Sequence, residues 1–86
     1  MPEISRFYGI VITMYFDDHQ PPHFHATYGE HEAGLTIPDA RLMEGWLPAR
    51  ALRLVRAWAF ANRGDLASEW RLARVHQPLF KIEPLE

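Results

Sequence analysis

The chain has 86 residues and a mass of 10.0 kDa, which fits one domain over residues 1–86 and leaves no room for a second. Its 48% hydrophobic and 13% aromatic content excludes a disordered chain, and the lack of cysteine excludes disulfides and cysteine-based zinc sites. The net charge of −2 is unevenly spread: residues 1–46 carry seven acidic residues and two arginines, whereas residues 47–76 carry six arginines and two acidic residues.

The first half of the chain has the alternating pattern of β-strands. Residues 8–16 are rich in β-branched and aromatic side chains and predict a first strand. Paired prolines end it within residues 17–22, because proline cannot donate to a strand ladder. Alternation resumes over residues 23–28 and again over 33–37, and a short segment at 41–46 predicts a fourth strand. The short connections favour an antiparallel meander.

The second half has helical spacing. Pro48 suits the first turn of a helix, whose apolar residues continue to Asn62. Gly64 is expected to end this helix, and Asp65 to cap a second one that runs from Leu66 to about residue 76. The tail that follows is expected to pair as a short edge strand. The sequence therefore predicts an α+β fold, a three- to four-stranded antiparallel meander followed by two helices packed on one face.

Candidate chemistry is concentrated in residues 17–31, which hold four of the five histidines. On a strand, His23 and His25 project to the same face, with Cα atoms about 6.5 Å apart. The prolines before them are expected to hold His19 or Asp17 nearby. Two imidazoles and a carboxylate suit a divalent transition metal such as Zn or Mn. His19, His23, His25 and Asp17 are therefore the candidate metal ligands.

Two other interpretations of the same histidines stay open. One neutral and one protonated imidazole serve as general base and general acid, so His19, His23 and His25 are also candidate catalytic residues for RNA cleavage without a metal. An antiparallel sheet with one solvated face would also place such side chains outward with no function at all.

The first predicted helix carries a candidate binding surface. Arg50, Arg53 and Arg56 recur every three residues and form a stripe suited to phosphates or an acidic partner. Leu52 and Phe60 lie outside the expected inner stripe, so they predict an apolar flank with a charged rim, the composition of a protein interface. An ordinary amphipathic helix explains the arginines equally well.

The sequence resembles the small bacterial proteins grouped as domain-of-unknown-function family 4160. The matching motifs cover nearly the whole chain: Arg6-Phe7-Tyr8-Gly9-Ile10-Val11-Ile12, Asp18-His19, Pro21-Pro22-His23-Phe24-His25-Ala26, Tyr28-Gly29-Glu30, Leu47-Pro48, Trp58, Trp70 and Lys81-Ile82-Glu83-Pro84-Leu85. In this resemblance the family's signature histidines correspond to His19, His23 and His25. Many members carry a further histidine where this chain has Asn62-Arg63, a departure that would weaken a site that needed it.

The resemblance implies a component of a bacterial toxin–antitoxin-type module, encoded beside a small protein of family 2442. We therefore expect either the toxin, with a histidine-rich site that acts on RNA or binds a divalent metal, or a non-enzymatic module that neutralises or scaffolds its partner. A homo- or hetero-oligomer is expected in both cases. With no apolar run long enough to span a bilayer and no secretory signal, we expect a cytoplasmic protein that does not bind membranes.

Overall fold

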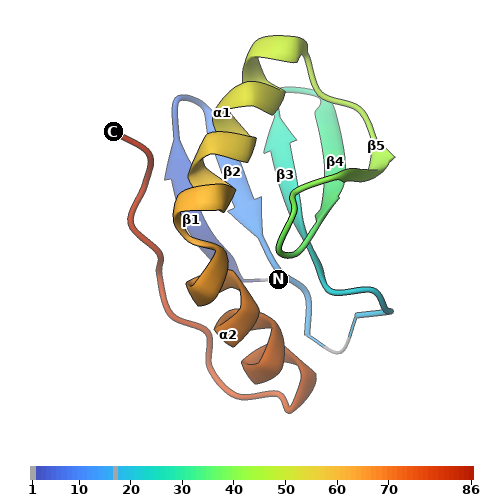
Figure 1. The fold of residues 1–86 in the computed structure, drawn as a ribbon, viewed down its shortest axis with the longest axis vertical. Coiled ribbons are helices and arrows are strands. Elements are labelled where there is room, and N and C mark those ends of the chain that lie inside the picture. Colours follow the sequence, from blue (N-terminus) through green and yellow to red (C-terminus); the bar gives the residue numbers. More distant parts are fainter. Residues whose placement is uncertain (1, 17) are drawn as a thin grey trace.

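A computed structural model describes residues 2–16 and 18–86 and contains one sheet and two helices (Figure 1). The strands follow one another in the sheet in chain order, and each is antiparallel to the next. The α+β class is confirmed, although the sheet has five strands instead of three or four. The elements are β1 (Glu3–Phe7), β2 (Ile10–Thr13), β3 (His23–Tyr28), β4 (His31–Thr36), β5 (Leu42–Gly45), α1 (Ala49–Ala61) and α2 (Arg63–Arg74).

The additional strand comes from a turn inside the predicted first strand. Tyr8 and Gly9 both have positive φ angles, 50° and 79°. Two such residues in succession are typical of the tight turns that join hairpin strands. The chain therefore reverses at this point, and the predicted strand at residues 8–16 becomes β2, with β1 paired beside it.

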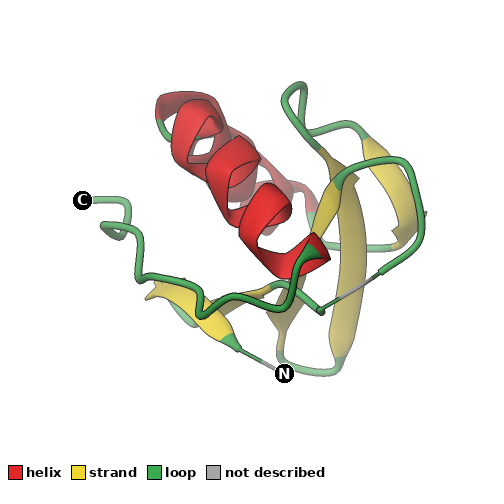
Figure 2. Ribbon diagram, turned by 90° about the horizontal axis from the view of Figure 1, so that it is seen from below, coloured by secondary structure: helices red, strands yellow, loops and turns green. Residues whose placement is uncertain are grey.

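The hydrophobic core lies between one face of the sheet and the two helices, which cover that face (Figure 2). Trp58 of α1 is fully buried, and its ring lies 5.5 Å from the ring of Phe7 and 5.9 Å from that of Phe24. Aromatic pairs at these separations are favourable beyond the area they bury. The packing leaves the opposite face of the sheet available for the polar residues that alternate along β3 and β4.

The two helices are separated by a single residue. Asn62 ends α1 and precedes α2, and its side chain donates to the Trp58 carbonyl over 2.8 Å. The expected break at Gly64 is wrong, because Gly64 lies within the first turn of α2. In Figure 1, α2 continues below α1 and extends past the lower end of the strands. No helix in the described part of the chain is long and apolar enough to cross a lipid bilayer.

The C-terminal tail runs back along the helices on the side of β1 (Figure 1). The Ile82 N–H donates to the Ile4 carbonyl of β1 over 2.8 Å, and the indole N–H of Trp58 donates to the Glu83 carbonyl over 2.8 Å. The tail is not a strand in the structure, so the expected edge strand is reduced to this backbone contact. Ile82 nevertheless belongs to the buried core.

Candidate metal centre

His23 and His25 occupy alternate positions of β3 and so lie on the same face of the sheet, opposite the face that packs on α1. Their side chains are not solvated, however: the residues are 1% and 6% exposed. The His23 ring lies 5.4 Å from the ring of Trp70 in α2, and the His25 ring lies 4.4 Å from that of Tyr15. The expectation of an open, wet face is therefore wrong at these two positions.

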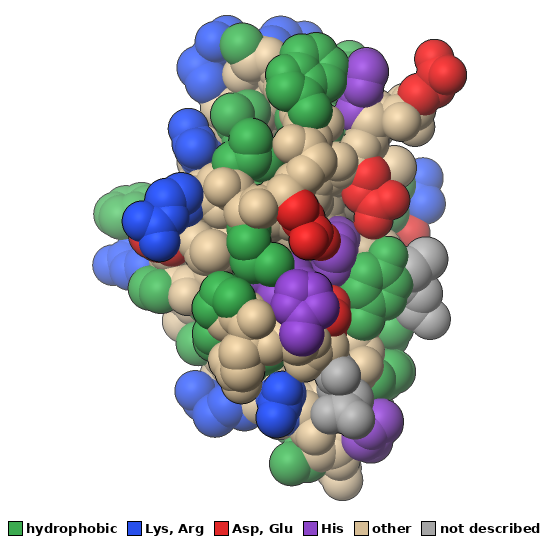
Figure 3. All heavy atoms as spheres, turned by 90° about the vertical axis from the view of Figure 1, so that its right-hand side faces the viewer, with side chains coloured by type: hydrophobic (Ala, Val, Ile, Leu, Met, Phe, Trp, Pro, Cys, Tyr) green, Lys and Arg blue, Asp and Glu red, His purple; other side chains and the backbone are tan. Residues whose placement is uncertain are grey.

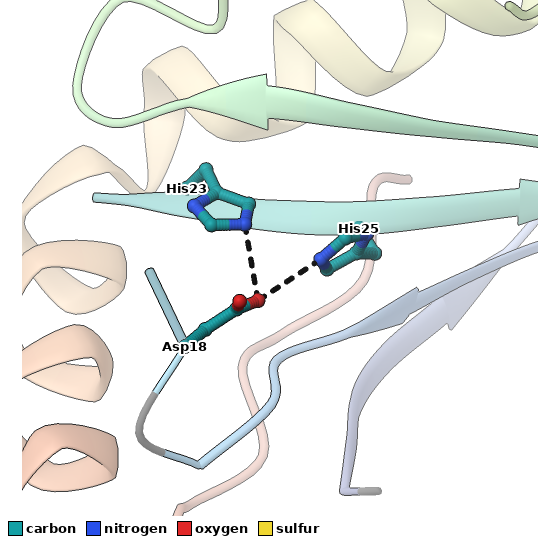
Figure 4. A group of neighbouring side chains, drawn as sticks. All are labelled: Asp18, His23 and His25. Carbon is teal, nitrogen blue, oxygen red and sulfur yellow. Dashed lines mark hydrogen bonds and ion pairs between the residues drawn. The ribbon is translucent and has the colours of Figure 1, made fainter. Parts of the chain in front are cut away.

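The carboxylate of Asp18 lies between the two imidazoles (Figure 4). Its Oδ2 atom is 3.0 Å from Nε2 of His23 and 3.3 Å from Nε2 of His25. Asp18 reaches this position from the loop between β2 and β3, and Nη1 of Arg74 in α2 donates to its main-chain carbonyl over 3.0 Å. The loop thus folds its acid back onto the strand that follows it.

His23 faces an oxygen acceptor at each ring nitrogen. Nδ1 lies 2.7 Å from the Pro21 carbonyl, which can only accept, so Nδ1 carries the proton. A neutral imidazole then has a bare lone pair at Nε2, which faces the Asp18 carboxylate at 3.0 Å. That contact lacks the alignment of a hydrogen bond, and within residues 2–16 and 18–86 the buried Nε2 has no hydrogen-bond partner. The arrangement therefore requires positive charge between His23 and Asp18, either a second ring proton or a cation.

The other two histidines repeat this pattern over longer distances. Nε2 of His25 faces Asp18, and its Nδ1 lies 3.7 Å from Oε2 of Glu32. The Tyr15 hydroxyl donates to the same Glu32 oxygen over 3.4 Å. His19 places Nδ1 3.2 Å from the Gln20 carbonyl and Nε2 3.7 Å from Oδ1 of Asp18. A carbonyl or carboxylate behind the ring is the usual outer partner of a metal-binding histidine.

Asp18 is held in its charged form. Burial alone would raise its pKa, but the hydrogen bonds from the His19 N–H and from His25, together with the nearby His23 and His19 rings, outweigh burial and leave the pKa below its ordinary value. For Tyr15, burial followed by the charge of Glu32 raises the pKa of the hydroxyl, so Tyr15 remains a hydrogen-bond donor. The centre thus presents a carboxylate anion and imidazole nitrogens to an ion or proton bound between them.

The donor spacing fits a transition-metal ion. Metal–nitrogen distances of about 2.0–2.1 Å place neighbouring ligands about 3.3–3.4 Å apart around a tetrahedral ion and about 2.9–3.0 Å apart around an octahedral one. The observed separations of 3.0 and 3.3 Å lie within the range that these two geometries span. All three donor atoms of Asp18, His23 and His25 lie within 4.8 Å of one another. Two imidazoles and one carboxylate suit Zn, Mn or Fe(II), and leave at least one coordination position open.

A pocket of about 260 Å³ opens beside this centre. Figure 3 shows histidine and acidic side chains gathered in the middle of this face, with lysine and arginine side chains toward its edges. A carboxylate oxygen of Glu44 lies within 4.8 Å of ring nitrogens of His19 and His23. The pocket is lined by His25, Glu32, Ala33, Gly34, Glu44 and Gly45.

The candidates predicted from sequence have different outcomes. The structure brings His19, His23 and His25 together, whereas Asp17 lies outside the described residues. The carboxylate in the described site is that of Asp18. Asp18, Glu32 and Glu44 were not among the predicted ligands. A correct register for β3 and β4 would have placed Glu32 near the histidines, because Glu32 pairs with Thr27 of β3. The position of Glu44 depends on the irregular pairing of β5 with β4 and has no such signal.

The predicted helix surface is divided by the packing. Phe60 is 66% exposed, with the Arg63 guanidinium 4.4 Å from its ring centre, whereas Leu52 is partly buried against the core. Arg56 donates to the Ala40 carbonyl over 3.0 Å. Among the described residues no hydrogen bond or ion pair joins Arg50, Arg53 or Arg56 to the histidines, whereas Arg74 donates to the loop of Asp18.

Comparison with known proteins gives one match. Residues 9–71 match the model of the family described as "Domain of unknown function (DUF4160)". The matched region includes strands β2 to β5, the loop of Asp18 and α1. No curated protein and no solved structure matches the chain. Since the match covers well over half of the 86 residues, the chain belongs to this family of domains of unknown function.

Proposed function

We propose that the protein binds a divalent transition metal, such as Zn or Mn, through Asp18, His23 and His25. The observation that carries the proposal is the contact between Nε2 of His23 and Oδ2 of Asp18. The His23 nitrogen is buried and lies 3.0 Å from the Asp18 oxygen, and the proton on Nδ1 leaves no neutral donor between them. A metal ion supplies the missing positive charge and uses the lone pair that Nε2 presents.

The biological setting we propose is a toxin–antitoxin-type module in which this chain works with a small partner protein, as toxin or as the partner that neutralises it. The family resemblance described above supports this setting. So does the exposed Phe60 on α1, which is a suitable anchor for a partner because aromatic and arginine side chains dominate binding energy at interfaces. Expression of the chain alone and with its neighbouring gene, scored by growth, tests the setting.

A metal-free acid–base centre acting on RNA is the second candidate. The same His23–Asp18 contact favours it, because a second ring proton is the other way to place positive charge there. Arg74, which donates to the Asp18 carbonyl, supplies a cation in contact with the loop. In this case the pair would act on a 2′-hydroxyl and a leaving oxygen with no metal present.

One titration separates the two candidates. The protein is stripped of metal with a chelator and titrated calorimetrically with Zn or Mn, in parallel with His23→Gln and His25→Gln. The metal proposal expects one ion per chain in the wild type and a loss of affinity of at least a hundredfold in each variant. As a matched control, His31→Gln changes an exposed histidine outside the centre and leaves affinity unchanged. Absence of binding in the wild type contradicts the metal proposal, and RNA cleavage by the stripped protein would then support the second candidate.

A further inference from the structure

Among the described residues, Glu44 is a carboxylate beside the centre that is neither a proposed ligand nor the outer partner of a histidine. Its oxygen lies within 4.8 Å of ring nitrogens of His19 and His23, and it lines the pocket together with His25. No hydrogen bond or ion pair joins Glu44 to another described residue. Its carboxylate is therefore available to a molecule bound in the pocket.

The backbone of the sheet fixes where Glu44 stands. Gly34 of β4 pairs with Glu44 of β5, and a Cβ atom at position 34 would lie 2.9 Å from Cγ of Glu44. The side chain of Glu44 thus lies over the bare Cα of Gly34, the residue that pairs with His25 on its other side. Gly45, with φ of 76°, allows the close approach of β5 to the Glu32 carbonyl, since a Cβ there would lie 2.1 Å from that oxygen.

The separation leaves room for one water molecule. The Glu44 carboxylate oxygen lies within 4.8 Å of the histidine nitrogens but makes no ion pair with them. It is therefore too distant for a direct hydrogen bond to either ring. A water on a metal ion at about 2.0–2.2 Å lies next to the ligand nitrogens, and a carboxylate accepts its proton at about 2.6–2.8 Å. A water bound at such an ion would therefore fit between the histidine nitrogens and Glu44, within hydrogen-bond reach of the carboxylate.

We propose that Glu44 is the proton acceptor for a water molecule bound at the open position of the metal centre, so that the centre is hydrolytic. This rests on the metal site proposed above. In the reaction the water transfers one proton to Glu44 and its oxygen attacks an electrophilic carbonyl carbon of an ester or amide. The bond to the leaving alcohol or amine then breaks, and the leaving group takes the proton from Glu44.

Charge selects this substrate class over a phosphodiester. Asp18, Glu32 and Glu44 bring three carboxylates around one divalent ion, so the centre remains net negative with the metal bound. An anionic phosphodiester would enter against this charge, whereas an uncharged ester or amide would not. The pocket itself is lined by Ala33, Gly34 and Gly45 beside the acids and carries no lysine or arginine that would attract an anionic phosphodiester.

The test loads the full-length chain with Co²⁺, whose visible absorption reports ionisation of a bound water, and titrates it between pH 5 and 9. It compares the wild type with Glu44→Gln, Gly34→Ala and the matched control Glu30→Gln, which removes an exposed acid from the turn between β3 and β4. Gly34→Ala displaces the Glu44 side chain without changing any ligand or any charge. Zn affinity is measured for each variant, and cleavage of p-nitrophenyl acetate by the Zn-loaded proteins is followed in parallel.

We expect the Zn affinity of all three variants to lie within threefold of the wild-type value. We also expect the Co²⁺ transition to move to lower pH by at least half a unit in Glu44→Gln, because a negative charge that opposes ionisation of the water is removed, with a smaller shift in Gly34→Ala and none in Glu30→Gln. Ester cleavage should fall at least tenfold in Glu44→Gln.

Two results overturn the proposal while leaving the metal site intact. A tenfold or greater loss of Zn affinity in Glu44→Gln would make Glu44 a ligand. An unchanged or absent transition with Co²⁺ bound would show that Glu44 does not touch a bound water. Failure of every protein to bind Zn or Co²⁺ would instead refute the metal site itself, and with it this inference.

Discussion

Glu69 is expected to make the protein less stable as the pH rises. This residue of α2 is fully buried; its Oε1 accepts a hydrogen bond from the Phe80 N–H over 3.0 Å, and its Oε2 has no partner. Burial raises the pKa of the carboxyl above its ordinary value of 4.5, the charge of Asp65 adds to this, and the Phe80 N–H acts in the opposite direction without cancelling it. Between the pKa of the unfolded chain and the higher pKa of the folded protein, the folded protein therefore holds a proton on Glu69 that the unfolded chain has released.

The sign and size of the effect follow from this single proton. A group whose pKa is higher in the folded state stabilises the fold fully below the unfolded pKa, and loses that contribution as the pH rises through the folded pKa. Over that interval the free energy of unfolding falls by at most about 1.4 kcal/mol per pH unit, the limit for one proton. Glu69→Gln keeps an oxygen for the Phe80 N–H but cannot ionise, so we expect it to match the wild type near pH 4 and to be the more stable protein at pH 8.

Urea unfolding followed by tryptophan fluorescence, in the presence of EDTA at fixed ionic strength, measures both proteins from pH 4 to 8.5. The two proteins differ only at position 69, so the difference between the two curves isolates Glu69. Glu69→Leu is the control: it leaves the Phe80 N–H without an acceptor, which costs about 1–3 kcal/mol at every pH. A difference between wild type and Glu69→Gln that stays constant across the pH range would refute the reasoning.

Four further results are expected. The His23→Gln/His25→Gln protein should lose metal binding and also about 1–3 kcal/mol of stability in EDTA, because both side chains are buried; equal urea midpoints would contradict this. Zn at a hundredfold excess over its dissociation constant should add about 2.7 kcal/mol to the wild type and nothing to that variant in thermal melts. Trp58→Phe should cost about 1–2 kcal/mol and loosen the tail near Glu83, seen as faster amide exchange there; unchanged exchange would count against the tail contact. Phe60→Asp should abolish any complex with the partner protein in light scattering without unfolding the chain, and a complex that survives would exclude Phe60 as an anchor.

Much of the fold could be predicted because its signals are local. The alternation in β3 correctly places Phe24 and Ala26 on the core face, and the helical spacing of α1 correctly places Val55 and Trp58 in the core. The additional strand could not be predicted from alternation, since Tyr8 is an unusual residue for the positive φ angle that the turn requires. The end of the first helix was predicted wrongly at Gly64 for the opposite reason. Glycine is a typical residue just after a helix, but here α2 begins before Gly64 and includes it.

The site was predicted in part. Placing His23 and His25 on one face required only the two-residue period of a strand. Trp70 lies against His23 and Arg74 holds the loop of Asp18, and both residues lie far away in the chain and reach the site only when α2 has packed. Glu44 is equally non-local, because its position depends on the missing side chain of Gly34. Contacts of this kind have no signature in the spacing of residues along the sequence.

The contacts from α2 to the site link the helix thermodynamically to whatever the centre binds. Arg74 donates to the carbonyl of Asp18, and the Trp70 ring lies against His23. A ligand that favours one position of Asp18 must also favour the docked position of α2, and the coupling is reciprocal. A partner protein that pulled α2 away would therefore lower the affinity of the centre for its ligand. A bound ligand would lower the affinity for that partner by the same factor. The helix is in this sense an effector element for a site to which it contributes none of the proposed ligands.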